Sequence, residues 1–233
     1  MTALKIFSGG AAHGLVRSVT GQFREKTGLD IEGEFGAVGV MAGKLRAGMR
    51  ADIVVLTAAL IADLVGENLV AAASVRDIGR VETALAVRAG DPPVIARDGE
   101  ALRATFLAAD AIFVPDTTTS TAGIHVANLL AKLGIAEEVA DRLKIFPNGA
   151  TAMRNLAASS AARPMGCTQA TEIIGTEGAV LSGSLPEGYD LATVYTAAIT
   201  AKTDKAAQAH VLIDLLTGAS QHQLRTRAGF VEL

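Results

Sequence analysis

The chain alternates between short apolar runs and amphipathic stretches over most of its length. Apolar runs typical of buried strands occur at 4–7, 53–56 and 111–114, and each is followed by a segment with the spacing of a helix. In the first of these helical segments, Leu15, Val19 and Phe23 fall on one face. Repeated alternation of this kind predicts an α/β fold with mainly parallel sheets flanked by helices, since a helix commonly makes the crossover between parallel strands.

Two longer β-type runs, at 81–87 and 191–200, stand apart from this alternation. The segment between them carries a complete strand–helix alternation of its own. This arrangement predicts two lobes joined by two crossing strands, with one lobe built from both chain ends. We expect residues 1–82 and 192–233 to form the first lobe and residues 83–191 to form the second.

Charge and composition exclude several classes of function. The net charge is −3 and there is no lysine- or arginine-rich run, so we expect no nucleic-acid partner. Half of the residues are hydrophobic, but no stretch approaches the roughly 20 apolar residues of a membrane span, so we expect no membrane insertion. The single cysteine, Cys167, excludes an internal disulfide, and the histidines lack the paired spacing of metal ligands. We therefore expect neither a metal nor a cofactor, and we expect Cys167 to be a small buried strand residue.

Two turn segments give the strongest indication of a binding site. Ser8-Gly9-Gly10 follows the first strand, and Asp-Thr-Thr-Thr-Ser-Thr at 116–121 follows the strand at 111–114. Each turn opens onto a helix, so backbone N–H groups, hydroxyls and the positive end of a helix dipole favour an anion there. Two such turns far apart in the chain predict an anionic or carboxylate-bearing ligand held between two lobes.

Several short motifs also occur in a characteristic order. Phe-Ser-Gly-Gly-Ala at 7–11 precedes Glu-Phe-Gly-Ala-Val-Gly at 34–39 and Ala-Asp-Ile-Val-Val-Leu at 51–56. Later come Ser-Thr-Ala-Gly-Ile-His at 120–125 and Met-Gly-Cys-Thr-Gln at 165–169. In order and spacing the chain resembles the type II periplasmic binding-protein superfamily, and within it the molybdate-binding-protein-like branch. The resemblance covers nearly the whole chain and implies a two-lobed α/β fold that closes on a small solute.

The resemblance also implies which residues contact the ligand. They are Ser8, Gly9 and Gly10 at the first turn, Ala37, Val38 and Gly39 at the second, Thr118, Thr119, Ser120 and Thr121 on the opposite wall, and Gln169 near the lobe junction. Position 38 departs from the pattern, because a molybdate-binding protein typically has a serine there and valine offers only its backbone N–H. This departure favours a ligand with an apolar portion, such as a small organic acid, over molybdate.

Two functions fit these observations. The first is a solute-binding protein that delivers a small anion to an ABC-transporter permease or senses it. The second is an isomerase of a small unsaturated polycarboxylate, similar to aconitate isomerase, in which a base moves an allylic proton while hydroxyls and helix N-termini hold the developing charge. His13 and Glu172 are the candidate bases. Solute binding ranks first, because no strong motif identifies catalytic residues.

Localisation follows from the N-terminal residues only as a conditional expectation. The first residues lead directly into a strand-like run, without the charged and apolar regions of an export signal. The sequence as it stands predicts a cytoplasmic protein. A chain from which a leader had been removed would predict a periplasmic one.

Overall fold

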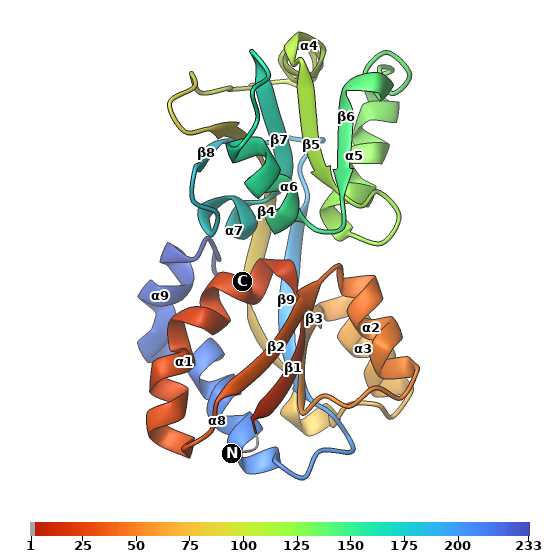
Figure 1. Cartoon of the computed structure of the whole chain (residues 1–233). Helices are drawn as coiled ribbons and strands as arrows, with labels where there is room; N and C mark the ends of the chain where they lie inside the picture. The colour runs from red at the N-terminus through yellow and green to blue at the C-terminus, as the bar shows by residue number, and fades with distance from the viewer. Residues whose placement is uncertain (1–2) are drawn as a thin grey trace. The chain divides into compact units, whose positions relative to one another are not determined.

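The computed structural model describes residues 3–233, which form two compact α/β units (Figure 1). The first unit contains the chain up to Val81 together with Thr193–Leu233, and the second contains Glu82–Ala192. Strands β4 (Arg76–Arg88) and β9 (Ala192–Ile199) each contribute residues to both units.

The first unit is built around three parallel strands. Strand β1 (Leu4–Gly9) lies between β2 (Ile31–Gly36) and β3 (Ile53–Thr57), and β9 runs antiparallel to β3 with Ile199 opposite Ile53. Helix α1 packs against α8, and α2 packs against α3, with the two pairs on opposite faces of the sheet (Figure 1). The helices of this unit are α1 (His13–Thr27), α2 (Val38–Arg46), α3 (Ala58–Gly66), α8 (Ala206–Thr217) and α9 (His222–Arg227), with short 3₁₀ segments at Gly10–Ala12, Ala72–Ser74 and Ala219–Gln221.

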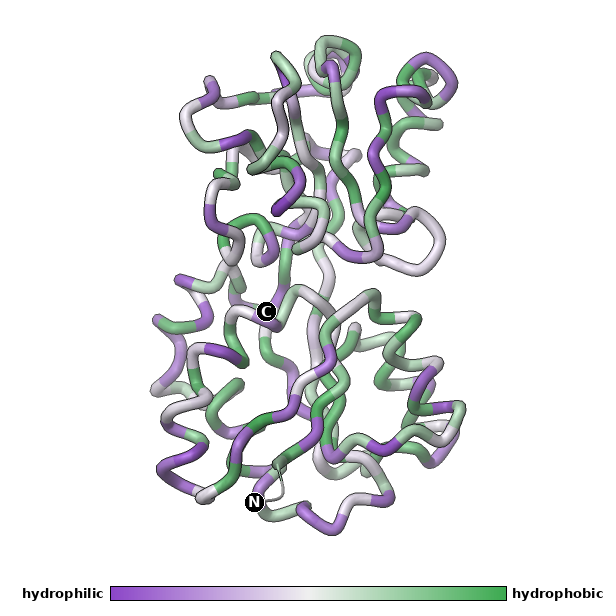
Figure 2. Tube along the Cα trace, in the orientation of Figure 1, coloured by the Kyte–Doolittle hydropathy of each residue, from purple (hydrophilic) through white to green (hydrophobic). Residues whose placement is uncertain are grey.

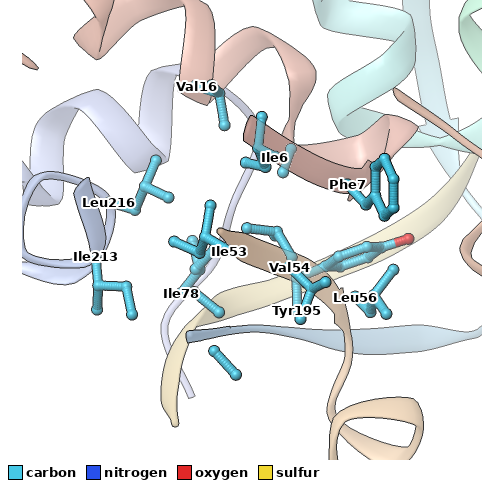
Figure 3. Close-up of a cluster of buried hydrophobic side chains, with 14 of the residues drawn as sticks. Ile6, Phe7, Val16, Ile53, Val54, Leu56, Ile78, Tyr195, Ile213 and Leu216 are labelled. Carbon is cyan, nitrogen blue, oxygen red and sulfur yellow. The ribbon is translucent and has the colours of Figure 1, made fainter. Parts of the chain in front are cut away.

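The core of the first unit forms where strand residues meet the helices on both faces. Ile6 of β1 and Ile53 of β3 lie in one cluster with Val16 of α1 and Leu216 of α8 (Figure 3). Four of the five residues of β3 are fully buried, as expected for a strand with a helix layer on each face. This rigid sheet fixes the turns that follow β1 and β2.

The second unit has its own parallel strands. Strand β5 (Ala111–Pro115) lies between β6 (Leu143–Phe146) and β7 (Pro164–Gln169), while β4 runs antiparallel to β7 and β8 (Ala179–Ser184) runs antiparallel to β4. Every residue of β5 and β7 is buried. Figure 2 shows hydrophobic residues along these strands and hydrophilic residues mainly in loops and on outer helix faces. The helices here are α4 (Gly99–Ala108), α5 (Thr121–Lys132), α6 (Gly149–Ala157) and α7 (Ala170–Ile174), with a 3₁₀ segment at Ala140–Arg142.

The predicted fold class, two α/β units of mainly parallel strands with flanking helices, is confirmed. Two local expectations differ from the structure. Strand β4 begins at Arg76 rather than at residue 81, and β6 has no counterpart in the sequence analysis. Strand β6 is a four-residue strand paired with β5, and its Lys144 and Ile145 are exposed, so it lacks the apolar run that marks the buried strands. Within residues 3–233, no helix is both long enough and apolar enough to cross a bilayer.

Candidate functional site

The first unit places two of the predicted turns side by side. Strands β1 and β2 pair in parallel with Gly9 opposite Gly36, so the turn at Ser8-Gly9-Gly10 and the turn at 36–39 lie at the same edge of the sheet. In open α/β sheets this carboxyl edge is where ligands usually bind. The geometry therefore groups the first-unit residues that the sequence analysis selected.

Ser8 and Gly9 form a tightly packed turn. Ser8 is fully buried, and its hydroxyl donates a hydrogen bond to the Gly9 carbonyl at 2.9 Å. A Cβ added at Gly9 would lie 2.7 Å from Val38 Cγ1 and 2.9 Å from Tyr195 Cε1, which is closer than carbon atoms approach without a shift. Glycine is thus required at position 9 by the side chains around it, a reason that no local sequence pattern reveals.

Val38 begins α2, after Ala37 as the N-cap residue. Its side chain is 6% exposed, and the adjacent Tyr195 is 2% exposed, whereas Gly39 is exposed. The first N–H groups of a helix have no intrahelical partner, so α2 offers backbone donors at this edge. These donors are flanked by the apolar side chain of Val38, and the Tyr195 hydroxyl would lie 3.6 Å from a Cβ at Gly9.

His13 is the first residue of α1 and is exposed. Its imidazole packs on Phe35 of β2, with ring centroids 4.4 Å apart and planes tilted by 39°. Phe35 thus fixes the position of the imidazole at the same edge of the sheet as Ser8. The sequence analysis did not select Phe35, because nothing local connects residues 13 and 35.

In the second unit, Asp116 organises the threonine-rich turn after β5. One carboxylate oxygen of Asp116 accepts hydrogen bonds from the N–H and hydroxyl of Thr118, at 2.8 and 2.7 Å, and from those of Thr119, at 2.8 and 2.9 Å. These hydrogen bonds lower the pKa of Asp116 from 3.8 to about 2. The hydroxyl protons of Thr118 and Thr119, which we expected to face a ligand, are directed to this carboxylate instead. An Asp followed by threonines indicates such a turn in the sequence, since Asp commonly accepts hydrogen bonds from the residues that follow it.

Ser120 and Thr121 differ from the two preceding threonines. Ser120 is the N-cap residue of α5 and makes no side-chain capping hydrogen bond, and Thr121 is the first helical residue. Both are partly exposed. The helix starts against the preceding strand, because a Cβ at Gly123 would lie 2.0 Å from the Asp116 carbonyl oxygen. Of the hydroxyls in this turn, those of Thr117, Ser120 and Thr121 are the ones not directed to Asp116.

Gln169 ends β7 and precedes α7 as its N-cap residue. It is 2% exposed and pairs with Thr83 of β4 across the antiparallel ladder. Among residues 3–233, the buried hydroxyls of Thr83 and of Thr171, at the start of α7, have no hydrogen-bond partner. A buried hydroxyl without a partner is unfavourable, so Thr83 joins the candidate residues that sequence reasoning missed.

Glu172 lies inside the second unit. Its carboxylate accepts a hydrogen bond from the Thr168 hydroxyl at 2.7 Å and others from the backbone N–H groups of Gly149, Ala150 and Gln169. Burial raises the pKa of Glu172 above its usual 4.5, although each of these hydrogen bonds favours the ionised form. The carboxylate occupies the N-terminus of α6, where a Cβ at Gly149 would lie 1.9 Å from Glu172 Oε2. This environment joins α6 and α7 and gives Glu172 a structural role.

Cys167 and His125, which lie in the sequence motifs of the second unit, are both held by their surroundings. Cys167 is fully buried in β7, and burial raises the pKa of its thiol to about 12, so the thiol is not a nucleophile at neutral pH. The His125 ring contacts the Tyr189 carbonyl through Nε2 at 2.8 Å. Within the part of the chain that the structure covers, no group of three or more His, Cys, Asp or Glu side chains is arranged to hold a metal ion.

Comparison with known proteins identifies the family of the chain. A family model described as bacterial extracellular solute-binding protein matches residues 4–231. The chain belongs to this family. The match confirms the resemblance drawn from the ordered motifs and covers both units of this solute-binding protein.

Solved structures share its fold, and one enzyme is similar to it in sequence. The periplasmic molybdate-binding protein of Azotobacter vinelandii superposes with a TM-score of 0.80 at 18% identity, covering 99% of each chain. The sulfate-binding protein of Mycobacterium tuberculosis H37Rv superposes with a TM-score of 0.75 at 18% identity, covering 100% of this chain and 88% of that one. An aconitate isomerase from a Pseudomonas species is 23% identical over 225 residues, which span 93% of this chain and 82% of the isomerase. At such identities the likeness establishes the fold and not the ligand.

Proposed function

We propose that this solute-binding protein binds a small organic carboxylate through helix N-termini and hydroxyls of the turns that the sequence analysis selected. The family supports solute binding, and the proteins of similar fold include binders of molybdate and sulfate, both of which are anions. Each unit has a helix N-terminus at the carboxyl edge of its parallel strands, which suits one end of an anionic ligand.

The observation that carries the choice of ligand is the packing of Val38. A tetrahedral oxyanion needs hydrogen-bond donors on all sides, and valine at the start of α2 supplies only a backbone N–H. The hydroxyl of Ser8 is used by the Gly9 carbonyl, and those of Thr118 and Thr119 are used by Asp116. The donors that remain in the two turns are helix N–H groups and the hydroxyls of Thr117, Ser120 and Thr121, with Thr83 in addition. Few donors beside apolar side chains suit a carboxylate on a carbon skeleton.

The proposed partner is an ABC-transporter permease at the outer face of the cytoplasmic membrane. This assignment rests on the extracellular character of the family. In this proposal the protein binds its solute in the periplasm or its equivalent.

The proposal is tested by titration calorimetry against two ligand groups. Molybdate and sulfate form one group, and succinate, citrate and the two aconitate isomers form the other. We expect a dissociation constant in the micromolar range for at least one carboxylate and no binding of the oxyanions. Tight binding of molybdate or sulfate by the unaltered protein would overturn the choice of ligand.

A matched pair of variants tests the role of position 38. Val38→Ser adds a hydroxyl at the buried first position of α2, whereas Val40→Ser makes the same change at a side chain that is 42% exposed. We expect Val38→Ser to weaken carboxylate binding by about tenfold, equivalent to ~1.4 kcal/mol, and Val40→Ser to leave it within twofold. Equal effects of the two variants would remove Val38 from the site.

The isomerase is the second candidate, favoured by the similarity to aconitate isomerase and by the placement of His13. In this reading the exposed imidazole on Phe35 moves the allylic proton, and Ser120 and Thr121 hold the carboxylate. NMR of cis- and trans-aconitate in heavy water tests it directly. Deuterium incorporation that is abolished by His13→Gln supports the isomerase, and a bound acid that exchanges no proton excludes it.

A further inference from the structure

A second cavity opens in the first unit, at the opposite edge of the sheet from Ser8 and Val38. It has a volume of about 750 Å³ and is lined by residues near the start of β1, after α2 and after β9. We call it the basal cavity, and its defining residues are Lys5, Arg50, Asn68, Thr200, Lys202 and Lys205. Its volume lies within the roughly 300–1,000 Å³ typical of small-molecule sites.

The charge balance of the basal cavity contrasts with that of the whole chain. The net charge of the chain is −3, whereas five cationic side chains and only two carboxylates, Asp52 and Asp204, line this cavity. Three of the cations have partners. Arg46 pairs with Glu67, Lys205 with Asp52 and Asp204, and Lys5 with Glu32.

The other two cations, Arg50 and Lys202, carry the inference. Both are exposed, and neither has an ion-pair partner among residues 3–233. They come from two segments that are far apart in the sequence, one after α2 and one after β9. Two unneutralised cations at one cavity, in an acidic chain, produce a local positive potential that attracts an anion.

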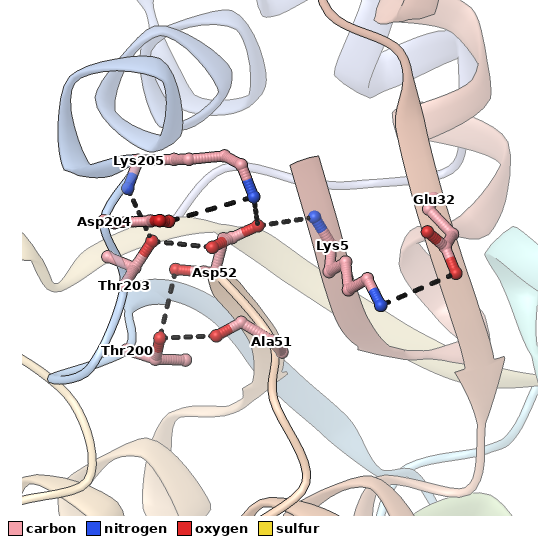
Figure 4. A network of polar contacts seen from close by, with 8 residues as sticks. All are labelled: Lys5, Glu32, Ala51, Asp52, Thr200, Thr203, Asp204 and Lys205. Carbon is pink, nitrogen blue, oxygen red and sulfur yellow. Dashed lines mark hydrogen bonds and ion pairs between the residues drawn. The ribbon is translucent and has the colours of Figure 1, made fainter. Parts of the chain in front are cut away.

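The floor of the basal cavity is fixed by a network around Asp52 (Figure 4). The Asp52 carboxylate accepts hydrogen bonds from the Lys5 backbone N–H at 2.8 Å and from the Thr203 hydroxyl at 2.7 Å, and it pairs with Lys205 at 3.4 Å. The Thr200 hydroxyl donates to the Ala51 carbonyl at 2.6 Å. The Asp52 carboxylate is thus engaged by Lys5, Thr203 and Lys205. It forms no ion pair with Arg50 or Lys202.

We propose that the basal cavity binds a phosphate monoester with an organic body, such as a mononucleotide. A phosphate monoester carries a charge of about −1.5 to −2 at pH 7 and three acceptor oxygens, which matches two cations and the fork of an arginine. Leu45, Met49 and Leu69 line the same cavity and provide an apolar wall. Inorganic phosphate would leave this wall and most of the volume without a contact.

The experiment is titration calorimetry with AMP, using adenosine as the matched ligand without a phosphate. The test variant is Arg50→Glu with Lys202→Glu. The control variant, Arg80→Glu with Arg97→Glu, makes the same charge change at two exposed residues that do not line the cavity. A third variant, Thr121→Val, changes the proposed solute site only. Circular dichroism confirms that each variant is folded.

We expect the unaltered protein to bind AMP at least about tenfold more tightly than adenosine. The test variant should weaken AMP binding at least tenfold, whereas the control variant and Thr121→Val should leave it within about twofold. Absence of AMP binding, or equal weakening by test and control variants, overturns the proposal. Loss of AMP binding in Thr121→Val also overturns it, because AMP would then occupy the proposed solute site. This inference does not depend on the proposed function.

Discussion

Replacing Glu172 by glutamine tests whether this residue is structural or catalytic. Four donors converge on its carboxylate, namely the Thr168 hydroxyl and the backbone N–H groups of Gly149, Ala150 and Gln169. Glutamine keeps one acceptor oxygen and turns an NH₂ group toward the remaining donors. One or two buried donors then lose their acceptor, at about 1–3 kcal/mol each. We expect Glu172→Gln to lower the free energy of unfolding by about 2–4 kcal/mol near pH 5.

The pH dependence of this loss follows from the direction of the pKa shift. Burial raises the folded-state pKa of Glu172 above its ordinary value of 4.5. The stabilising contribution is therefore complete below pH 4.5 and is lost as the pH rises through the folded-state pKa. Glutamine does not titrate, so the difference in stability between the unaltered protein and Glu172→Gln should narrow as the pH rises.

Thermal unfolding followed by circular dichroism measures this difference. For a unit of this size each kcal/mol shifts the midpoint by about 3–4 °C, so a fall of roughly 10 °C is expected near pH 5. Glu177→Gln is the matched control, because Glu177 lies in the same unit and is exposed. A loss below about 0.5 kcal/mol would refute the structural role and restore Glu172 as a candidate base. A difference that widens with pH would refute the direction of the pKa shift.

Three further predictions concern single residues. Gly9→Ala should destabilise the first unit by about 1–3 kcal/mol, because the added Cβ collides with Val38 and Tyr195. An unchanged midpoint of thermal unfolding would contradict this expectation. Asp116→Ala should lower stability by about 1 kcal/mol through the loss of four hydrogen bonds in a partly exposed turn. The stabilisation by Asp116 is present above pH 3.8 and is lost as the pH falls toward 2. Hydrogen exchange of the Thr118 and Thr119 amides measures the loss of these hydrogen bonds, and an unchanged exchange rate in Asp116→Ala would contradict the prediction. Cys167, with a thiol pKa of about 12, should react with a disulfide reagent at pH 8 only after unfolding, and rapid labelling of the folded protein would disprove its burial.

Much of the fold was predictable from local patterns. Strands β1, β3 and β5 begin at residues 4, 53 and 111, where the apolar runs of the sequence begin. Such patterns are local, because a buried strand between two helix layers must be apolar along its length. The edge strand β6 escaped because an edge position carries no such requirement. The first residues of β4 escaped because Arg76, Asp77 and Arg80 interrupt the apolar pattern there.

The candidate site was predictable only as a set of turns. The sequence correctly indicated that the turns at 8–10 and 116–121 each open onto a helix. It did not indicate that Asp116 takes the hydroxyls of Thr118 and Thr119, although an Asp before threonines is a recognisable turn signal. The side chains that require glycine at position 9 belong to residues 38 and 195, and no pattern within one segment connects them.

The sequence by itself therefore determined the order of elements, the two-unit plan and the family, because these follow from periodicity and from motifs that neighbouring residues share. Tertiary structure alone decided that Glu172 holds the start of α6, that Val38 packs against Gly9, and that Asp52 leaves Arg50 and Lys202 without a partner. Each of these depends on where a side chain meets residues from distant segments. Hydrogen bonds and van der Waals contacts act over a few ångströms of space, whatever the separation along the chain.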